Sequence, residues 1–250
     1  MTAALRAQGL TKRFGGFVAN SDVTLVLPPG ARHALIGPNG AGKTTLINLL
    51  TGVLAPTSGD VFLGEERVTS LPQHARVKRG LARTFQINTL FPGLTVLESV
   101  VLAVCGGRGT TRLWYRTVAE RHEEIAEARA LLERLLLASE ADKPVRELAY
   151  GKQRLVEIAL ALATKPSILI LDEPAAGIPS HASLELFGVI AALPRDVSIL
   201  FIEHDVDIVF RFAERVTVLA NGSVLAEGTP GEISADRRVR EVYLGEVEHG

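Results

Sequence analysis

Residues 37–44 read Gly37-Pro38-Asn39-Gly40-Ala41-Gly42-Lys43-Thr44, which matches the pattern G-x-x-x-x-G-K-[ST]. The apolar stretch from Arg32 to Ile36 just before it predicts a strand, and Thr44 to Thr51 predicts a helix closed by Gly52. Glycines let the backbone wrap closely around a phosphate, and the N–H groups at a helix start point toward the anion. This strand–loop–helix arrangement predicts a phosphate-binding loop.

The side chains of this loop have chemistry that suits a bound nucleotide and its metal. We expect the Lys43 ammonium to reach the β- and γ-phosphates and the Thr44 hydroxyl to ligate Mg²⁺. The alternative is a glycine-rich turn without function, but a chance match is expected in only about one in a hundred chains of this size. The residues expected to bind the nucleotide are Gly37, Pro38, Asn39, Gly40, Ala41, Gly42, Lys43, Thr44 and Thr45.

A second apolar stretch, Ile168 to Leu171, predicts a strand buried on both faces, and it ends in the acids Asp172 and Glu173. A nucleotide site needs a carboxylate on the metal side and a group that positions water. We expect Asp172 to hold Mg²⁺, directly or through water, and Glu173 to polarise the attacking water. The alternative is a buried strand capped by acids before a turn at Pro174. Beside a phosphate-binding loop, the catalytic interpretation is favoured.

Composition bounds the class of protein. The chain has 250 residues, is 47% hydrophobic and carries a formal net charge of -1. A near-neutral chain gives no electrostatic reason to expect a nucleic-acid partner. The single cysteine, Cys105, follows apolar neighbours and is expected to be a buried thiol. Met1 to Leu10 lacks the apolar stretch of a signal peptide, and no apolar run approaches the roughly 20 residues of a membrane span.

The order of predicted elements indicates an α/β sheet with parallel strands. Strands are expected at Leu5 to Leu10, Val23 to Leu27, Arg32 to Ile36, Val61 to Leu63, Ile168 to Leu171, Val197 to Ile202, Val216 to Ala220 and Ser223 to Glu227. Val118 to Leu137 and Arg154 to Thr164 have apolar residues at helical spacing. We therefore expect a helical stretch, about 88–164, to be inserted between core segments of about 1–87 and 165–227, with a short helical tail at 228–250.

Four further elements identify the family that the chain resembles. Leu148-Ala149-Tyr150-Gly151-Lys152-Gln153-Arg154 lies shortly before the acidic pair and opens a helix, as the ABC signature motif does. Gln86 in Arg83-Thr84-Phe85-Gln86 resembles the Q-loop glutamine, and His204, after a later strand, resembles the switch histidine. Phe14 resembles the aromatic residue that stacks on adenine. The resemblance to ABC-type ATPases covers essentially the whole chain.

The resemblance implies roles for these residues. Gln86 would ligate Mg²⁺ and sense a membrane permease, and His204 would contact the γ-phosphate and orient water. Phe14 would stack on adenine, with Phe17 as a competitor. The signature residues Ala149, Tyr150, Gly151 and Lys152 would face a nucleotide held by a second subunit.

The resemblance also implies the fold and the assembly. The fold would be a RecA-like P-loop α/β core with an antiparallel β-subdomain and the inserted helical subdomain, all in a single ABC ATPase domain at 1–250. A homo- or heterodimer would enclose ATP and Mg²⁺ at the cytoplasmic face of the inner membrane. Integral-membrane permease subunits would be direct partners, and a periplasmic or extracellular solute-binding protein an indirect one. The segment Ile87 to Leu94, with Leu90, Phe91 and Pro92, is the candidate permease contact; a core turn is the alternative.

Finer features resemble one subfamily. The Tyr-Gly form of the signature, the run Asp172-Glu173-Pro174-Ala175-Ala176-Gly177 and the ending Glu241-Val242-Tyr243-Leu244-Gly245 are similar to the ATP-binding subunits of branched-chain (hydrophobic) amino acid importers. Relatives in that subfamily import urea, short amides or aromatic acids, so the solute stays open.

Two positions depart from the family pattern. Ala149 stands where the signature usually carries a serine, so one hydroxyl donor to the partner's γ-phosphate is missing. Pro179 stands where the D-loop usually carries Asp or Asn, and proline has no backbone donor either. Both departures concern the site that this chain's signature would complete in a partner.

Three other classes of function compete with this interpretation. An ABC-type ATPase of DNA repair or translation usually has two cassettes, a long coiled coil or a zinc hook, and none of these patterns is present. A kinase or GTPase would share the phosphate loop, but no guanine-reading Asn-Lys-x-Asp pattern occurs and a signature motif has no place in such enzymes. A weakly hydrolysing regulatory subunit is supported only by Ala149 and Pro179.

Overall fold

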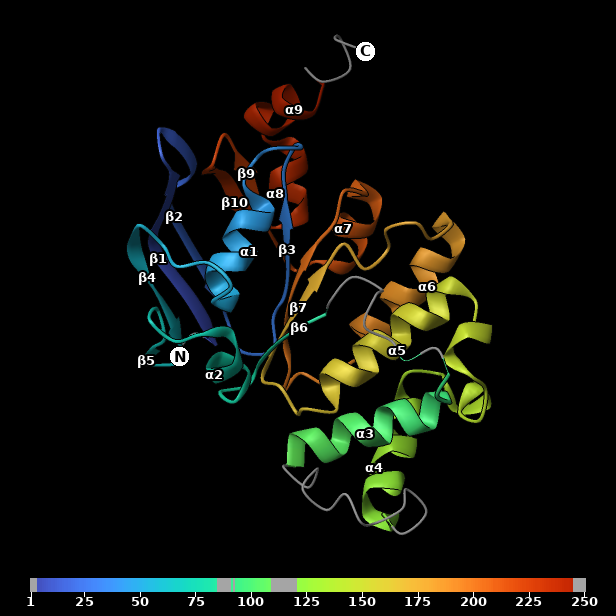
Figure 1. Ribbon diagram of the computed structural model, residues 1–250. Helices are drawn as coiled ribbons and strands as arrows, with labels where there is room; N and C mark the ends of the chain where they lie inside the picture. Colours follow the sequence, from blue (N-terminus) through green and yellow to red (C-terminus); the bar gives the residue numbers. More distant parts are fainter. Residues whose placement is uncertain (1–3, 85–90, 92, 109–120, 245–250) are drawn as a thin grey trace.

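The computed structural model describes residues 4–84, 91, 93–108 and 121–244 (Figure 1). A six-stranded sheet has the order β10-β9-β3-β8-β7-β6, in which only β10 runs antiparallel to its neighbour. A smaller antiparallel sheet has the order β2-β1-β4-β5. The predicted α/β core and antiparallel N-terminal sheet are therefore confirmed.

The strands are β1 (Leu5–Phe14), β2 (Phe17–Leu27), β3 (Arg32–Ile36), β4 (Ser58–Leu63), β5 (Glu66–Arg67), β6 (Leu81–Arg83), β7 (Ile168–Asp172), β8 (Ser198–Ile202), β9 (Arg215–Ala220) and β10 (Ser223–Gly228). The α-helices are α1 (Lys43–Thr51), α2 (Gln73–Val77), α3 (Val96–Arg108), α4 (His122–Arg134), α5 (Tyr150–Leu162), α6 (Ser180–Ala191), α7 (Val206–Phe212), α8 (Pro230–Ala235) and α9 (Arg237–Leu244). Short 3-10 helices cover Ala138–Glu140 and Val145–Glu147.

Several predicted boundaries are wrong, each for a local reason. β1 and β2 are longer than predicted because they continue to a tight turn that pairs Phe14 with Phe17. The helix expected to reach Leu137 ends at Arg134, since Leu136 has a positive φ of 56° that an α-helix does not allow. The helix expected from Arg154 already begins at Tyr150. The first part of the predicted helix at 118–137 lies outside the described residues.

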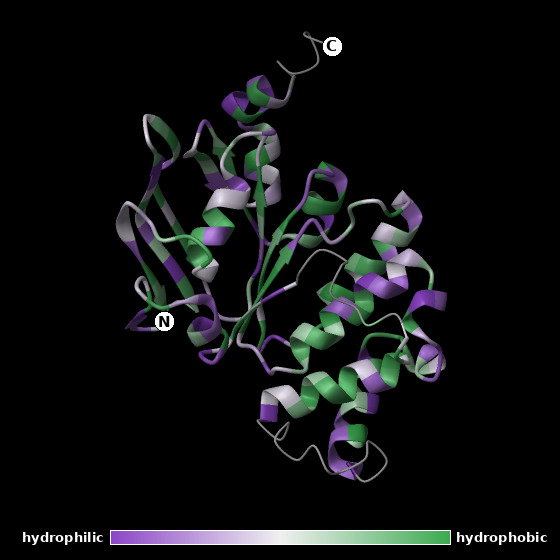
Figure 2. Cartoon of the chain, in the orientation of Figure 1, coloured by the Kyte–Doolittle hydropathy of each residue, from purple (hydrophilic) through white to green (hydrophobic). Residues whose placement is uncertain are grey.

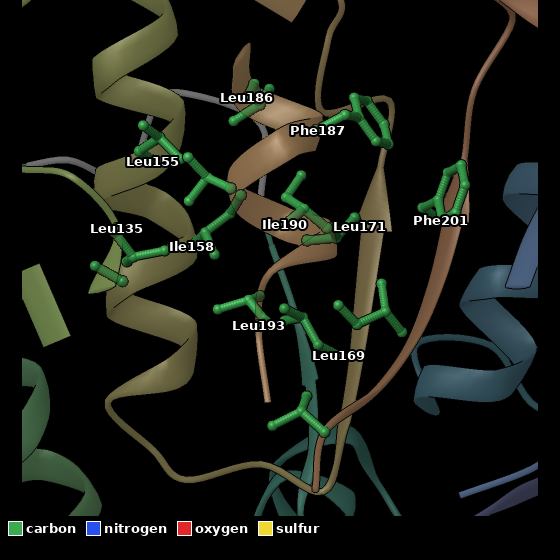
Figure 3. Packing of buried hydrophobic residues seen from close by; sticks show 14 of the residues in the cluster. Leu135, Leu155, Ile158, Leu169, Leu171, Leu186, Phe187, Ile190, Leu193 and Phe201 are labelled. Atoms are coloured by element: carbon green, nitrogen blue, oxygen red, sulfur yellow. The ribbon is translucent and has the colours of Figure 1, made fainter. Parts of the chain in front are cut away.

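Both faces of the central sheet are buried, which explains why its strands read as continuous apolar runs. Along β7, Leu169 and Leu171 pack in one hydrophobic cluster, whereas Ile168 and Ile170 pack in another. Figure 3 shows the first cluster, with side chains from α5 and α6 meeting those of β7. Hydropathy coloring in Figure 2 shows the central strands as mostly green, hydrophobic segments.

The chain leaves the sheet after β6 and returns at β7, and α3, α4 and α5 lie between them in sequence. Figure 1 shows these helices together on the side of the sheet away from α1. Of the helices that the structure describes, none combines the length and the apolar character that crossing a bilayer requires.

A buried arginine fixes the far end of α1, the helix that follows the phosphate loop. The Arg76 side chain is 1% exposed and donates hydrogen bonds to the carbonyl oxygens of Leu49 (2.8 Å) and Leu50 (2.7 Å). These carbonyls belong to the last turn of α1, where the helix has ended before it can supply an i+4 donor, and the Leu49 carbonyl also accepts from the N–H of the Gly52 cap at 3.3 Å. Burial lowers the pKa of Arg76 to about 10. The guanidinium therefore caps α1 and links it to α2, the helix that carries Arg76.

Beneath the phosphate loop, β3 carries a fully buried histidine. His33 Nε2 lies 2.8 Å from the Thr217 hydroxyl of β9. Burial lowers the pKa of His33 from 6.5 to about 4. Between these values the unfolded chain takes up a proton that the folded chain excludes, so stability falls as the pH drops from 6.5 toward 4.

We expect acidification from pH 7 to pH 5 to cost the wild type about 2 kcal/mol of unfolding free energy through this residue. His33→Gln should remove that part of the pH dependence, whatever its effect at pH 7. Urea unfolding at both pH values measures it, and His181→Gln on the surface of α6 controls for the loss of a histidine. An equally steep pH dependence in His33→Gln would show that His33 is not responsible.

Candidate active site

The loop between β3 and α1 can be formed only with glycine at two of its positions. Gly37 has a φ of 151°, and a Cβ there would lie 2.2 Å from the Leu219 carbonyl oxygen. Gly42 has a φ of 97°, and a Cβ there would lie 2.5 Å from the Ala19 carbonyl oxygen. Both contacts are with backbone, which cannot move aside. The sequence pattern therefore reflects a backbone that passes tightly between β2 and β9.

Lys43 is folded back into this loop. Its side chain is largely buried, at 7% residue exposure, and Nζ donates to the carbonyl oxygens of Gly37 (2.6 Å) and Pro38 (3.0 Å). On the other side of the loop, the buried Asn20 amide donates to the Gly42 carbonyl at 3.3 Å. The ammonium thus lies inside the glycine cradle, where it can neutralise a bound phosphate. Sequence reasoning did not find Asn20, which lies on a different element.

Asp172 and Glu173 lie where β7 ends, beside the end of β8. Because β7 and β8 are parallel neighbours with Asp172 opposite Ile202, the residues after both strands meet at one edge of the sheet. Glu173 has a positive φ of 49° and donates its N–H to the Ile202 carbonyl at 3.1 Å. This left-handed backbone turns the Glu173 side chain toward β8.

The structure brings Glu173 and His204 together. His204 Nε2 lies 2.7 Å from Glu173 Oε1, although the residues are 31 positions apart in sequence. Both side chains reach solvent, with side-chain exposures of 46% for His204 and 32% for Glu173. A carboxylate beside an imidazole, open to water, can accept a proton from a water molecule and hold that water in place.

Glu203, next to His204, was not assigned a role from the sequence. It is 5% exposed, and its carboxylate accepts hydrogen bonds from the Ala175 N–H (2.8 Å) and the His204 N–H (3.3 Å). Burial raises the pKa of Glu203. The two loops therefore brace one another, because Glu173 contacts the loop after β8 while Glu203 contacts the loop after β7. An acid directly after the apolar stretch Ile199–Ile202 was the available sequence signal.

Asp172 has a partner that sequence reasoning also missed. Arg83, at the end of β6, donates from Nη2 to Asp172 Oδ2 at 2.5 Å and from Nη1 to Asn48 Oδ1 at 2.7 Å.

Thr44, the expected second metal ligand, is exposed at the start of α1.

The signature residues lie at the start of α5. Ala149 is the exposed N-cap residue and supplies no side-chain hydrogen bond. The Tyr150 hydroxyl accepts from Arg154 Nη2 at 3.1 Å, and the Lys152 ammonium pairs with the Glu140 carboxylate. Figure 1 shows α5 and α1 on opposite sides of the central sheet. Within one chain, the phosphate loop and the signature therefore remain apart.

Of the other predicted site residues, the structure describes some and not others. Phe14 and Phe17 flank the turn between β1 and β2 and are 47% and 66% exposed, so both rings are open to a ligand. Figure 1 shows this turn at the same end of the molecule as the loop before α1. Gln86 lies outside the described residues, as do Leu90 and Pro92. Phe91, from the predicted permease contact, is 64% exposed.

Residues 20–176 match the family model described as ABC transporter. That match spans more than half of the chain and includes the phosphate loop, the signature and the acidic pair. The chain belongs to the ABC transporter family. As a member of that family it is an ABC-type ATPase that binds nucleotide. Residues 223–249 of this ABC ATPase also match the model described as Branched-chain amino acid ATP-binding cassette transporter.

One curated relative and two solved structures are similar to the chain over most of its length. The ABC ATPase is 40% identical to LivG of Escherichia coli (strain K12), described as a high-affinity branched-chain amino acid transport ATP-binding protein, across 97% of this chain and 98% of LivG. Its fold matches the ADP conformation of MJ1267, an ATP-binding cassette of an ABC transporter, with a TM-score of 0.86 and 31% identity over 98% and 100% of the two chains. It also matches the dimeric post-hydrolysis state of MJ0796 bound to ADP and Pi, with a TM-score of 0.73 and 26% identity over 90% and 98%.

Proposed function

We propose that this ABC ATPase binds and hydrolyses MgATP to drive the import of branched-chain or other hydrophobic amino acids through a separate membrane permease. The observation that carries the catalytic part is the 2.7 Å contact between Glu173 and His204. These residues follow β7 and β8, and the next strand in the sheet, β3, leads into the phosphate loop. Base, switch histidine and phosphate cradle thus share one edge of the sheet.

The residues present fit ATP and its magnesium ion. Gly37 and Gly42 leave no room for a side chain against the Leu219 and Ala19 carbonyl oxygens, so only glycine lets the loop take this path, and Lys43 supplies a cation inside the loop. The Thr44 hydroxyl and the Asp172 carboxylate are hard oxygen donors of the kind Mg²⁺ takes alongside phosphate oxygens. Bound there, Mg²⁺ would neutralise phosphate charge. We propose Gln86 as a further ligand of Mg²⁺. We propose Phe14 as the ring that stacks on adenine.

The proposed chemistry assigns one task to each side chain. Lys43 and the N–H groups of the loop hold the phosphates so that the γ-phosphorus is open to attack. Glu173 accepts the proton of the attacking water, and the His204 imidazole orients that water and contacts the γ-phosphate. Glu203 keeps the two loops in register through its hydrogen bonds to both.

We further propose that two ABC ATPase subunits form each nucleotide site, the phosphate loop of one facing the signature of the other. Three observations support this: α1 and α5 lie apart in one chain, Ala149 and Gly151 are not buried, and MJ0796 is dimeric with ADP and Pi. The assembly would lie at the cytoplasmic face of the membrane, with the segment at 87–94 in contact with the permease. The solute is inferred from LivG and from the match at residues 223–249.

Affinity-tagged chain isolated from its native membranes tests this function. We expect an integral-membrane protein to co-purify, and vesicles holding that complex, its solute-binding protein and internal ATP to accumulate radiolabelled leucine. Uptake should be lost with Glu173→Gln in the same vesicles. Uptake of urea, an amide or an aromatic acid instead of leucine would contradict the solute. Isolation of an active ATPase with no membrane protein co-purifying from the native membranes would contradict transport and favour a non-transport ABC-type ATPase.

The isolated chain should hydrolyse ATP slowly, because Ala149 lacks a hydroxyl that could donate to the partner's γ-phosphate. A hydrogen bond to a charged group is worth about 1.5–3 kcal/mol, so Ala149→Ser should raise turnover by about 10–100-fold at each site using this signature. Pro179, the N-cap residue of α6, sets an upper limit on the gain if it displaces the D-loop. Phosphate release at saturating ATP measures the effect.

Serine at this position also has a structural effect that needs a control. Ala149 is the N-cap of α5, and serine there can accept from the helix and stabilise it by about 1 kcal/mol. Ala149→Asp caps α5 equally well but places a negative charge toward the phosphate. Both variants should raise the melting temperature, and only Ala149→Ser should raise turnover. Unchanged turnover in Ala149→Ser, with nucleotide-driven dimerisation intact, would show that the missing hydroxyl is not limiting.

A further inference from the structure

Arg83 connects three elements of the candidate site. It is the last residue of β6, and its guanidinium bridges Asp172 at the end of β7 and Asn48 in α1. The side chains of Arg83 and Asp172 are only 15% and 14% exposed, so solvent screens this ion pair little.

The position of Asn48 shows from which side Arg83 approaches. Thr44 and Asn48 lie four residues apart on α1 and therefore on one face of the helix, separated by one turn or about 6 Å. Thr44 is exposed whereas Asn48 is half-buried, so the helix face becomes more enclosed toward Asn48. Arg83 thus reaches Asp172 from one turn behind Thr44, on the side away from the opening of the loop.

The bond geometry limits the motion of the Asp172 carboxylate. A planar guanidinium held by two acceptors on different elements cannot rotate freely, and it fixes whatever it binds. Arg83 bonds to Asp172 Oδ2, at 2.5 Å. With Oδ2 fixed from behind, the orientation of Oδ1 is fixed as well, because the two oxygens belong to one planar group.

We propose that Arg83 is a positioning residue for Asp172, which holds one carboxylate oxygen so that the other is presented toward Thr44 and the metal of the bound nucleotide. Asn48 is the anchor that keeps the guanidinium in place. This inference rests on the proposed nucleotide site. Residues that orient a metal ligand through a hydrogen bond typically change metal affinity about 10–100-fold when they are replaced.

The test measures metal affinity rather than turnover. Wild-type chain is saturated with ADP, and bound Mn²⁺, used in place of Mg²⁺, is titrated by electron paramagnetic resonance. Arg83→Gln should raise the Mn²⁺ concentration for half-saturation by about tenfold while leaving metal-free ADP affinity unchanged. Arg83→Lys keeps the charge but cannot bridge both acceptors, so it should recover only part of the loss.

Asn48→Ala provides a milder variant in case Arg83→Gln folds poorly. It should raise the half-saturating Mn²⁺ concentration in the wild-type background and have no further effect in the Arg83→Gln background, as expected if Asn48 acts through Arg83. Arg79→Gln, at an exposed arginine paired with Glu66, is the matched control and should change nothing.

The outcomes separate this inference from the proposed function. If wild-type chain binds ADP and Mn²⁺ but Arg83→Gln has the same or a lower half-saturating metal concentration, the positioning role is wrong. A lower concentration would indicate that Arg83 is a counter-cation that competes with the metal. If the wild-type chain binds no nucleotide at all, the proposed function itself fails.

Discussion

Glu173→Gln is expected to retain ATP binding and to lower the rate of ATP hydrolysis by about 100–10,000-fold, the usual contribution of a general base. Glutamine has nearly the size of glutamate and can keep a hydrogen bond to His204 Nε2, which lies 2.7 Å from the present carboxylate. It cannot accept the proton of water. The change therefore removes the proposed chemistry while leaving the backbone turn at Glu173 intact.

Phosphate release under saturating MgATP measures the loss, and light scattering should show that the variant accumulates as an ATP-bound dimer. Glu185→Gln, an exposed acid on α6, serves as the control and should hydrolyse ATP at the wild-type rate. Undiminished hydrolysis by Glu173→Gln would place the base elsewhere, with His204 as the next candidate.

Lys43→Ala is expected to weaken MgATP binding by at least about 100-fold, because it removes charge-assisted hydrogen bonds to two phosphates worth about 1.5–3 kcal/mol each. The ammonium already lies within the glycine cradle, bonded to the Gly37 and Pro38 carbonyl oxygens. Calorimetric titration of MgATP measures the affinity.

The Lys43 variant needs a check of its fold, because the wild-type ammonium also bonds to the loop carbonyls. Circular dichroism should show native helix content, and Lys78→Ala, at an exposed lysine after α2, should bind MgATP normally. Micromolar MgATP affinity retained by Lys43→Ala would rule out this lysine as the main phosphate ligand.

Much of the fold could be predicted because strands that are buried on both faces of the sheet consist of continuous runs of apolar residues. Ile168–Asp172 and Ser198–Ile202 were found within a residue of their bounds for this reason. The helix after the phosphate loop was also predicted to within one residue, since it follows the glycine-rich loop directly and Gly52 marks its end. The three-residue strand β6 carries too short a pattern to be separated from a loop.

The candidate site was predictable where function requires one residue type at a fixed spacing. Lys43 and Thr44 follow from the phosphate-loop pattern, and Asp172 with Glu173 follows from a buried strand that ends in acids. The contacts between them were not predictable, because they depend on which strands are neighbours. Arg83 and Asp172 are 89 positions apart and meet only because β6 lies beside β7.

The side-chain partners of the signature residues also depend on tertiary packing. Lys152 was expected to face a partner's nucleotide, a role that stays a prediction, and in the single chain its ammonium pairs with Glu140. Glu140 lies in a 3-10 helix of three residues that carries no repeating pattern, so the sequence alone does not indicate its pairing with Lys152. Side-chain pairing across such short elements depends on tertiary packing rather than on local preference.

In the proposed mechanism, the loop at residues 37–45 holds the phosphates of ATP and a second subunit's signature closes over them. Cryo-electron microscopy of the Glu173→Gln complex with its membrane partner, MgATP and the solute-binding protein tests this most directly. We predict nucleotide density with the γ-phosphate in contact with Lys43 and facing a partner signature motif. Nucleotide density away from Gly37–Thr45, or a γ-phosphate that faces only solvent in a closed dimer, would contradict the account.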